Sequence, residues 1–381
     1  MTTTRWLFGL AVVLMAIAMP LMFACSSAAP TSAPQNVSVS PTPLQNAWED
    51  TVKAAQQEGT VNIYATAMSP AIGPLREAFK QKYGVNLEFV EGRPPEVMAK
   101  IKAERQAGLY LVDVGHLGET TSMMDVKPLK IVSPLSDLMV LEDVKNPRSW
   151  IGTVVPFLDK EHQVLMFTAM AITPGVINTD MVKAGDISSW LDLLKPEWKG
   201  KIVFSDPSVS GGSPNMLASL VKTFGKDRTI EILGQLAAQE PMLTRDQRLL
   251  QEWVARGKYP VGLGASIGLI TEFKAAGAHI DPLKLKEPRH ISGGPGNLVV
   301  FNDNPHPKAT KLYVNWLLGK EAQSIWSKAL GYPSMRTDVG GEGLDPATLP
   351  RADDVFPNEE QMQLRVEMRT LSAKIFGSAA Q

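Results

Sequence analysis

The first part of the folded chain alternates between short apolar runs and longer segments with helical spacing. Residues 61–66, 85–90 and 111–114 have the pattern of strands. Between them, apolar side chains recur at helical spacing up to Gly84 and Gly108, where two helices are expected to end. Strand, helix, strand, helix, strand is the order of a parallel sheet that has helices on both faces. We therefore expect an α/β fold.

The same alternation returns later in the chain. Strands are expected at residues 164–177, 201–204, 259–263 and 297–301, with helices between them. A strongly amphipathic helix is expected at residues 307–318. At 381 residues the chain is too long for one ordinary domain. Two α/β units without a long linker predict two lobes that face a cleft, where small-molecule sites commonly form.

The N-terminal region predicts export. Residues 6–24 form an uncharged apolar run of nineteen residues behind a single cation, Arg5. This length lies between that of an ordinary signal peptide and that of a membrane span, so length alone leaves both interpretations open. The end of the run, Ala24-Cys25-Ser26, resembles a bacterial lipoprotein signal, in which cleavage before the cysteine is followed by lipid attachment. We expect residues 1–24 to be the signal peptide and Cys25 to carry the lipid.

Residues 25–46 are expected to form a tether. Fourteen of the twenty-one residues from 26 to 46 are Ser, Thr, Ala or Pro, a composition that cannot bury apolar surface. Folding should begin near Asn46, whose side chain can cap a helix while Glu49 reaches back. Cys25 is the only cysteine, which excludes an internal disulfide.

The charge balance excludes some classes of function. Lys and Arg number 38 and Asp and Glu number 39, which gives a net charge of −1. Nucleic-acid binding needs a basic excess or a basic patch, so no nucleic acid is expected as a partner. The chain has no motif with metal-ligand spacing, and an exported, tethered α/β chain suits capture and delivery better than chemistry. We expect a binding protein without a cofactor or metal, and not an enzyme.

Four segments resemble the solute-binding proteins of ABC importers, in the branch known for ferric-iron binding. They are residues 57–61 (Gln-Glu-Gly-Thr-Val), residues 190–202 (Trp-Leu-Asp-Leu-Leu-Lys-Pro-Glu-Trp-Lys-Gly-Lys-Ile), residues 206–211 with Asp206-Pro207 and Ser210-Gly211, and residues 304–323 with Asn-Pro-His-Pro-Lys-Ala, Trp-Leu-Leu and Glu-Ala-Gln. Together they cover nearly the whole folded region in the order typical of the family.

This resemblance implies a periplasmic-binding-protein-like fold of type II, with two α/β lobes, a ligand cleft and hinge crossovers. We expect one lobe to comprise residues 47–168 and 296–330, and the other residues 169–295 and 331–381. The implied function is that of a monomeric lipoprotein, in the periplasm or at the cell surface, that captures a small ligand and delivers it to an ABC importer permease. Ferric-iron binding is the alternative within binding, and a receptor domain that feeds a signalling partner is an alternative outside it.

Candidate ligand contacts lie in loops after strands, because ligands of open α/β sheets bind at the carboxyl ends of the strands. In the second lobe, the loop before a helix exposes backbone N–H groups suited to an anion. The candidates are Ser210, Gly211, Gly212 and Ser213 in this loop, and Ser69, Arg93 and His116 in the first lobe. The structural alternatives are helix capping by the last serine of the loop, a surface arginine, and a solvated histidine.

The pentapeptide Gly-Ala-Ser-Ile-Gly around Ser266 matches the nucleophile elbow of serine hydrolases. Such an enzyme needs Asp and His later in the chain, and the available pairs are Asp281 with His290 and Asp303 with His306. Their spacing is too short for whole secondary-structure units between the two members. We therefore keep a secreted hydrolase only as an alternative of another class. Ser266 is a further candidate ligand contact, and its structural alternative is a glycine-rich turn between a strand and a helix.

The iron carriers of the family hold Fe³⁺ through tyrosine phenolates, including an adjacent pair after a late strand of the second lobe. The matching stretch here, residues 264–269, contains no tyrosine. The six tyrosines lie at positions 64, 83, 110, 259, 313 and 332, and no two are adjacent. We therefore expect a small organic anion as the ligand, and no iron bound in the manner of these carriers.

Overall fold

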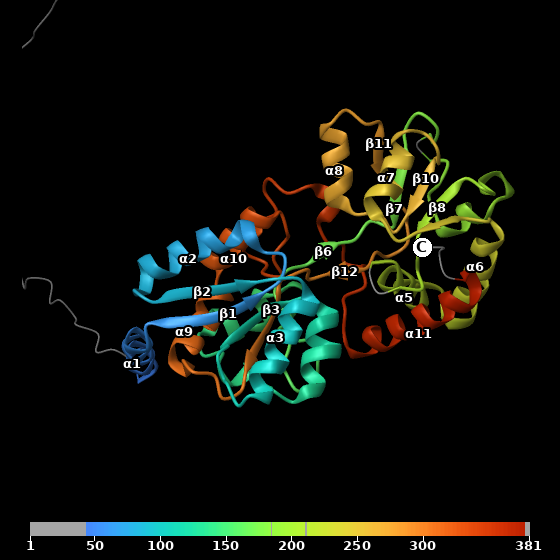
Figure 1. Cartoon of the computed structure of the whole chain (residues 1–381). Coiled ribbons are helices and arrows are strands. Elements are labelled where there is room, and N and C mark those ends of the chain that lie inside the picture. The colour runs from blue at the N-terminus through green and yellow to red at the C-terminus, as the bar shows by residue number, and fades with distance from the viewer. Residues whose placement is uncertain (1–42, 184, 210–211, 378–381) are drawn as a thin grey trace, which may run out of the picture. The chain divides into compact units, whose positions relative to one another are not determined.

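The computed structural model describes residues 43–183, 185–209 and 212–377. A first sheet combines strands from the early part of this region with one strand from its late part (Figure 1). Its order is β2-β1-β3-β13-β4, with β5 paired to β13. β1 is parallel to β2 and β3, whereas β13 runs antiparallel to β3, β4 and β5. The strands are β1 (Thr60–Ala65), β2 (Asn86–Glu91), β3 (Val114–Leu117), β4 (Val132–Ser133), β5 (Leu165–Met166) and β13 (Asn297–Phe301).

A second sheet is formed by the middle of the chain, in the order β11-β7-β10-β8-β9. β8 is parallel to β9 and β10, and β7 is antiparallel to β10 and β11. The carboxyl ends of the parallel strands therefore meet at one edge of this sheet. The strands are β7 (Gly175–Asn178), β8 (Ile202–Ser205), β9 (Met242–Thr244), β10 (Val261–Leu263) and β11 (Ile280–Pro282).

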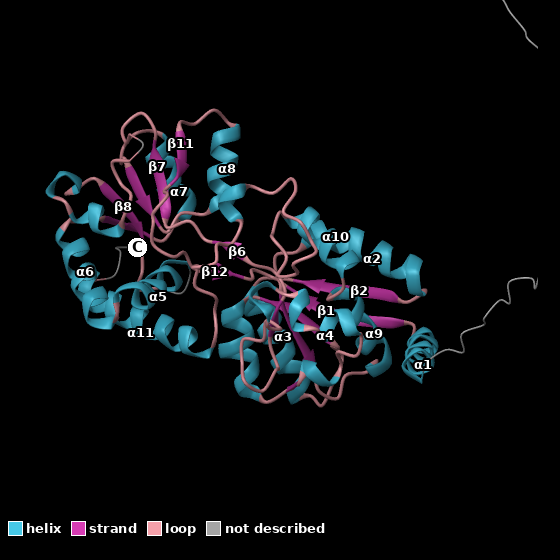
Figure 2. Ribbon diagram, turned by 180° about the vertical axis from the view of Figure 1, so that it is seen from behind, coloured by secondary structure: helices cyan, strands magenta, loops and turns pink. Residues whose placement is uncertain are grey.

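Helices pack around both sheets (Figure 2). The helices are α1 (Pro43–Glu58), α2 (Ser69–Tyr83), α3 (Pro94–Gln106), α4 (Glu142–Lys145), α5 (Gly212–Phe224), α6 (Lys226–Ala238), α7 (Gln247–Ala255), α8 (Ile267–Ala275), α9 (Pro307–Leu317), α10 (Lys320–Leu330) and α11 (Glu359–Phe376), with short 3₁₀ and π turns between some of them. In the described part of the chain, no helix is both long and apolar enough to cross a membrane.

The first sheet has one buried core, whereas the second sheet contributes to two. α2, α3, α9 and α10 contribute to the first core, and α5 and α6 contribute to the second. α7 and α8 form a third cluster with other residues of the second sheet. We call each sheet with the helices on its core a lobe. Met335 and Met362 belong to the first core and Met368 to the second. The chain after residue 331, expected in the second lobe, is therefore shared between the two cores; the other lobe boundaries stay predictions.

Three segments of the chain lie together between the lobes. β6 (Met170–Ala171) and β12 (Ile291–Ser292) pair as antiparallel strands and carry the chain from one sheet to the other and back. Beside them, Val355 forms a parallel bridge with His290. The crossovers expected from the family resemblance are thus joined by a third strand-like segment that leads into α11.

The Gly-Gly-Pro-Gly run after β12 is packed too closely for side chains. A Cβ added to Gly293 would lie 2.6 Å from Met166 Cγ, and one added to Gly296 would lie 2.0 Å from Thr168 Oγ1. Thr168 Oγ1 also donates a hydrogen bond to the carbonyl oxygen of Gly293 at 2.5 Å. The glycines therefore let the second crossover lie directly against the first.

The expected order of β1, α2, β2 and α3 is confirmed, and three expectations are wrong. The third strand is Val114–Leu117, because the apolar residues just before it (109–111), exposed by 44–48%, lie in a loop. The run at residues 164–177, expected as one strand, is divided into β5, β6 and β7. α1 begins at Pro43, so Asn46 lies inside this helix and does not cap it.

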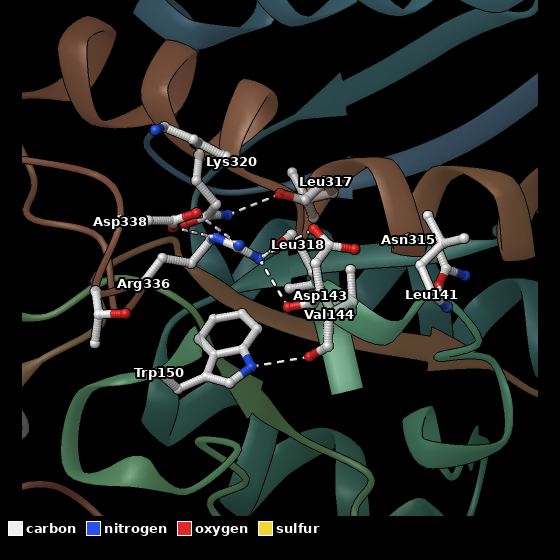
Figure 3. A network of polar contacts seen from close by, with 12 residues as sticks. Leu141, Asp143, Val144, Trp150, Asn315, Leu317, Leu318, Lys320, Arg336 and Asp338 are labelled. Carbon is white, nitrogen blue, oxygen red and sulfur yellow. Dashed lines mark hydrogen bonds and ion pairs between the residues drawn. The ribbon is translucent and has the colours of Figure 1, made fainter. Parts of the chain in front are cut away.

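Arg336 anchors the segment after α10 to the first lobe (Figure 3). Its side chain is only 2% exposed and lies over the Trp150 ring, 5.7 Å from the ring centroid. It donates to Asp338 Oδ1 at 2.8 Å and to the Leu318 carbonyl oxygen at 2.9 Å. The hydrogen bond from Arg336 also lowers the pKa of the Asp338 carboxyl. This buried cation is thus satisfied by a carboxylate, a carbonyl group and an aromatic ring.

Replacing Arg336 by methionine should lower the free energy of unfolding by about 2 kcal/mol, because the buried Leu318 carbonyl oxygen would lose its donor and the contact with the Trp150 ring would be lost. Urea denaturation of residues 26–381 measures this loss. Arg228→Met is the control, since Arg228 pairs with Glu231 on the exposed face of α6 and should cost less than about 0.5 kcal/mol. Equal losses for the two variants would contradict the anchoring role.

Candidate ligand-binding site

A cavity of about 170 Å³ lies beside the first crossover, at the carboxyl edge of the second sheet. Its walls come from β6 and the chain after it, from α5, from the start of α7, and from the turn between β10 and α8 with the first residue of α8. The lining residues are Met170, Ile172, Thr173, Met216, Gln247, Gly264, Ala265, Ser266 and Ile267. This is the edge at which the loops after strands were expected to hold the ligand.

The turn between β10 and α8 is held against the start of α5. Gly264 has a φ of 74°, a conformation that favours glycine, and a Cβ there would lie 2.4 Å from Ser213 Oγ. Ser213 is buried and donates its hydroxyl to the Ser205 carbonyl oxygen at 2.9 Å. Gln247 Nε2 donates to the Gly264 carbonyl oxygen at 3.3 Å. The structure thus brings together the start of α5, which contains Ser213, and the turn that contains Ser266, two residues predicted separately.

Ser266 immediately precedes α8 and lines the cavity. Its carbonyl oxygen accepts a hydrogen bond from Gln251 Nε2 at 2.7 Å, which fixes the backbone of the turn. Its hydroxyl does not cap α8, and within the described residues it makes no hydrogen bond. The first N–H groups of α8 therefore border the cavity without a side-chain cap.

The loop before α5 carries the other candidates of the second lobe. Ser210 and Gly211 lie outside the described residues, and Gly212 is the first residue of α5. The start of the loop is fixed by the buried carboxylate of Asp206, which accepts hydrogen bonds from the Ser208 backbone N–H at 2.9 Å and from Arg245 Nε at 3.1 Å. Arg245, whose side chain is 41% exposed, is therefore a cation held close to this edge.

Two candidates of the first lobe are exposed and bonded to nearby carboxylates. Ser69 donates its hydroxyl to Glu91, which also accepts from the Met68 backbone N–H at 2.5 Å. Arg93 Nε donates to Glu96 Oε1 at 2.9 Å within the first turn of α3, and this carboxylate raises the pKa of Arg93. Neither residue lines the cavity. The side chain of Arg93 thus takes the surface role that was its structural alternative.

His116 is inside β3 and not in a loop after it, so the expected position is wrong. The side chain is fully buried, and its Nε2 lies 2.8 Å from the Tyr313 hydroxyl. Its ring also packs against Phe167 and Trp326. Burial lowers the pKa of His116 to about 3, so the imidazole is neutral in the core. A buried side chain cannot touch a ligand in this arrangement, and we leave His116 out of the site.

The sequence did not single out Thr173 or Gln247, which also line the cavity. Thr173 Oγ1 donates to the Gly175 carbonyl oxygen at 2.8 Å and shapes the turn after the first crossover. Gln247 is the first residue of α7, behind an Asp246 cap that accepts from the Leu249 backbone N–H at 3.0 Å. Such a cap is a local signal for the start of a helix, but it does not indicate that the helix reaches a ligand.

The cavity does not fit a hard metal ion. Among the described residues, no three His, Cys, Asp or Glu side chains are grouped so that they could hold a metal, and none of those lining the cavity is a tyrosine or a carboxylate. Tyr64 donates to Glu104 at 2.7 Å, and Tyr259 packs against Trp253, so both rings are engaged elsewhere. Ferric iron needs anionic oxygen donors, which these walls lack.

The described surroundings of Ser266 also lack the partners of a serine nucleophile. His290 lies 2.9 Å from Arg365 Nη2, and His306 lies 2.8 Å from Asp113, the residue just before β3. Asp281 pairs with Lys274. The histidines and this aspartate that a hydrolase would require are therefore bonded to other groups.

Comparisons with known proteins show the family and the fold. The family described as bacterial extracellular solute-binding protein matches residues 75–348. An uncharacterized protein of Haemophilus influenzae is 24% identical over 276 residues, which cover 71% of this chain and 76% of that protein. A Trichodesmium protein in complex with iron and citrate superposes with a TM-score of 0.69 at 18% identity, over 83% of this chain and 99% of the other.

The periplasmic binding protein AfuA of Actinobacillus pleuropneumoniae, with fructose-6-phosphate bound, superposes with a TM-score of 0.57 at 21% identity, over 84% of this chain and 98% of that one. These likenesses show the two-lobe fold of periplasmic binding proteins. The family match covers well over half of the 381 residues. The chain therefore belongs to the bacterial extracellular solute-binding proteins, which deliver small ligands to ABC permeases.

Proposed function

We propose that this protein captures a small organic anion with an apolar portion in the cavity beside Ser266 and delivers it to an ABC importer permease. The composition of the cavity wall carries the proposal. The side chains of Met170, Ile172, Met216 and Ile267 supply apolar surface, and an organic ligand gains free energy by burying carbon against it. A bare metal ion or a small inorganic anion has no carbon to bury against these four side chains.

The charge of the ligand is inferred from the polar end of the same cavity. The uncapped N-terminus of α8 and the free hydroxyl of Ser266 offer hydrogen-bond donors, and the helix dipole favours a negative group there. No acidic side chain among the described residues lines the cavity to oppose an anion. Ser213, one of the candidates for anion binding in the loop before α5, lies directly beside Gly264 at the same edge.

Ferric iron is the second candidate, because a Trichodesmium protein of similar fold holds iron and citrate. AfuA, which also has a similar fold, holds fructose-6-phosphate, so this fold accommodates both metals and small phosphates. The absence of tyrosine and carboxylate from the described lining favours the organic anion for this chain.

The family is extracellular, and we propose that this member is held at the membrane by lipid on Cys25 and acts as a monomer. Cys25 lies outside the described residues, so this part of the proposal is supported by the lipoprotein-like sequence at the end of the leader. A binding protein needs no catalytic group. The two histidines that could have assisted Ser266 are bonded to other residues, which supports this part of the proposal.

Ser266→Ala should weaken anion binding about tenfold or more, because the variant loses one hydrogen-bond donor to a charged group. Thermal-shift screening of small carboxylates, phosphates and phosphonates first identifies a probe, and calorimetry then compares its affinity for the two proteins. Ser324→Ala is the control, since Ser324 is exposed on α10. Unchanged affinity in Ser266→Ala would show that the anion binds elsewhere. Stabilisation of the protein by metal ions alone in the screen would exclude an organic anion as the ligand.

Ferric citrate added to the purified protein should produce no phenolate-to-iron charge-transfer band, because no tyrosine lines the cavity among the described residues. The visible spectrum and the iron content after gel filtration measure this directly. One tightly held iron per chain together with such a band would establish the second candidate.

Cys25→Ala in the native host should leave an unprocessed precursor, because lipoprotein processing requires the cysteine at the cleavage site. Immunoblotting of membrane and soluble fractions compares the variant with the wild type. Ser26→Ala, next to the cysteine, is the control and should be processed normally. Full release of wild-type protein without attached lipid would contradict the anchor.

A further inference from the structure

α11 is shared between the cores of the two lobes. Met362, near the start of the helix, belongs to the first core, and Met368, six positions later, belongs to the second. Beyond Met368 the helix continues over the second lobe, where it packs against α5 and α6 (Figure 1). One rigid element thus touches both lobes, in addition to the β6 and β12 crossovers.

The start of α11 is tied to the first lobe by an ion pair. Lys127 Nζ lies 2.7 Å from Glu359 Oε1, the first residue of the helix, and also contacts Asp159 at 3.0 Å and Glu161 at 2.7 Å. Burial lowers the pKa of Lys127, but these carboxylates outweigh burial and raise it, so the amine is charged. The side chain of Lys127 is 18% exposed and that of Glu359 is 35% exposed.

The middle of α11 is tied to the hinge. Arg365, 5% exposed, points Nη2 to His290 Nε2 at 2.9 Å. Because arginine only donates, His290 accepts and is neutral, and burial together with the charge of Arg365 keeps its pKa well below the usual value. On the other side of the hinge, Glu119 accepts hydrogen bonds from the Gly293 backbone N–H at 2.9 Å and from Ser292 Oγ at 3.3 Å.

These contacts differ in how easily they can be released. The hydrogen bond of Arg365 is buried, and breaking it would leave this interior cation with only the weak acceptor Met362 Sδ, 3.3 Å from Nη1. The carboxylate of Glu359 is partly solvated, and Lys127 keeps two other carboxylates when this one leaves. A relative movement of the lobes would therefore separate Lys127 from Glu359 at a lower cost than it would break the hinge contact.

We infer that α11 is a clamp between the lobes: it stays attached to the second lobe and to the hinge. Its contacts with the first lobe, the Lys127–Glu359 ion pair and the packing of Met362, stabilise the arrangement of the lobes seen here, and the ion pair is the more easily released of the two. The permease or the ligand would act against this contact when it favours another arrangement. The inference goes beyond the proposed function and does not depend on which solute binds, so the two can fail separately.

Distance measurements between the lobes test the clamp. Residues 44–381 form one compact unit, and the chain from residue 26 contains no cysteine, so Lys102→Cys on α3 and Gln235→Cys on α6 can carry one spin label each. Pulsed electron resonance then compares this labelled protein with the same protein carrying Glu359→Gln. We expect the variant to raise the population at other interlobe distances about two- to fivefold.

Glu367→Gln is a matched control, because Glu367 also lies on α11 and pairs with Lys226 at 2.8 Å, but within the second lobe. It should leave the distance distribution unchanged. High salt should move the starting protein toward the Glu359→Gln distribution and leave that variant unchanged, since salt screens a partly exposed ion pair. The clamp is overturned if Glu359→Gln leaves the distribution unchanged, or if the two variants, with circular dichroism unaltered, change it equally.

Discussion

The pairing of β13 with β3 imposes the plan of this molecule. β13 lies between β3 and β4 in the first sheet, although Asn297 and Leu117, which face each other, are 180 residues apart in the sequence. The residues from Leu298 to Phe301 are buried, so the centre of the first core depends on this late strand. Gly115 permits the close pairing, since a Cβ there would lie 2.7 Å from Val299 Cγ2. The first sheet contains strands that precede the second sheet in the sequence and one strand, β13, that follows it. The chain must therefore cross between the lobes twice.

The crossings also produce the cavity. The chain that leaves the first lobe through β6 passes the carboxyl edge of the second sheet, so Met170 and Thr173 meet Ser266 and Gln247 there. The parallel strands end at this edge, so the helices that follow them begin there. The N-termini of these helices add backbone N–H donors to the cavity without any charged side chain. Apolar walls with uncapped N–H groups suit an organic anion better than a metal.

Flexibility between the lobes is limited by the same arrangement. The glycine run after β12 places the second crossover against the first, so bending has little room at that point. α11 adds packing in both cores and a buried hydrogen bond from Arg365 to His290. When the lobes move, the contacts that can break at a small cost in free energy are therefore mainly those of partly solvated charges, such as Glu359.

The sequence by itself determined the order of β1, α2, β2 and α3, and it pointed to Ser266, because apolar spacing and glycine-rich turns act within a few residues. His116 marks the limit. Its burial depends on Tyr313, 197 positions away, and no local pattern separates a core histidine from one in a loop. Thr173 and Gln247 reach the cavity through a crossover and a helix start that carry no ligand signal of their own. Only the tertiary structure decided these positions, because a cavity and a core are made by residues that long-range strand pairing brings together.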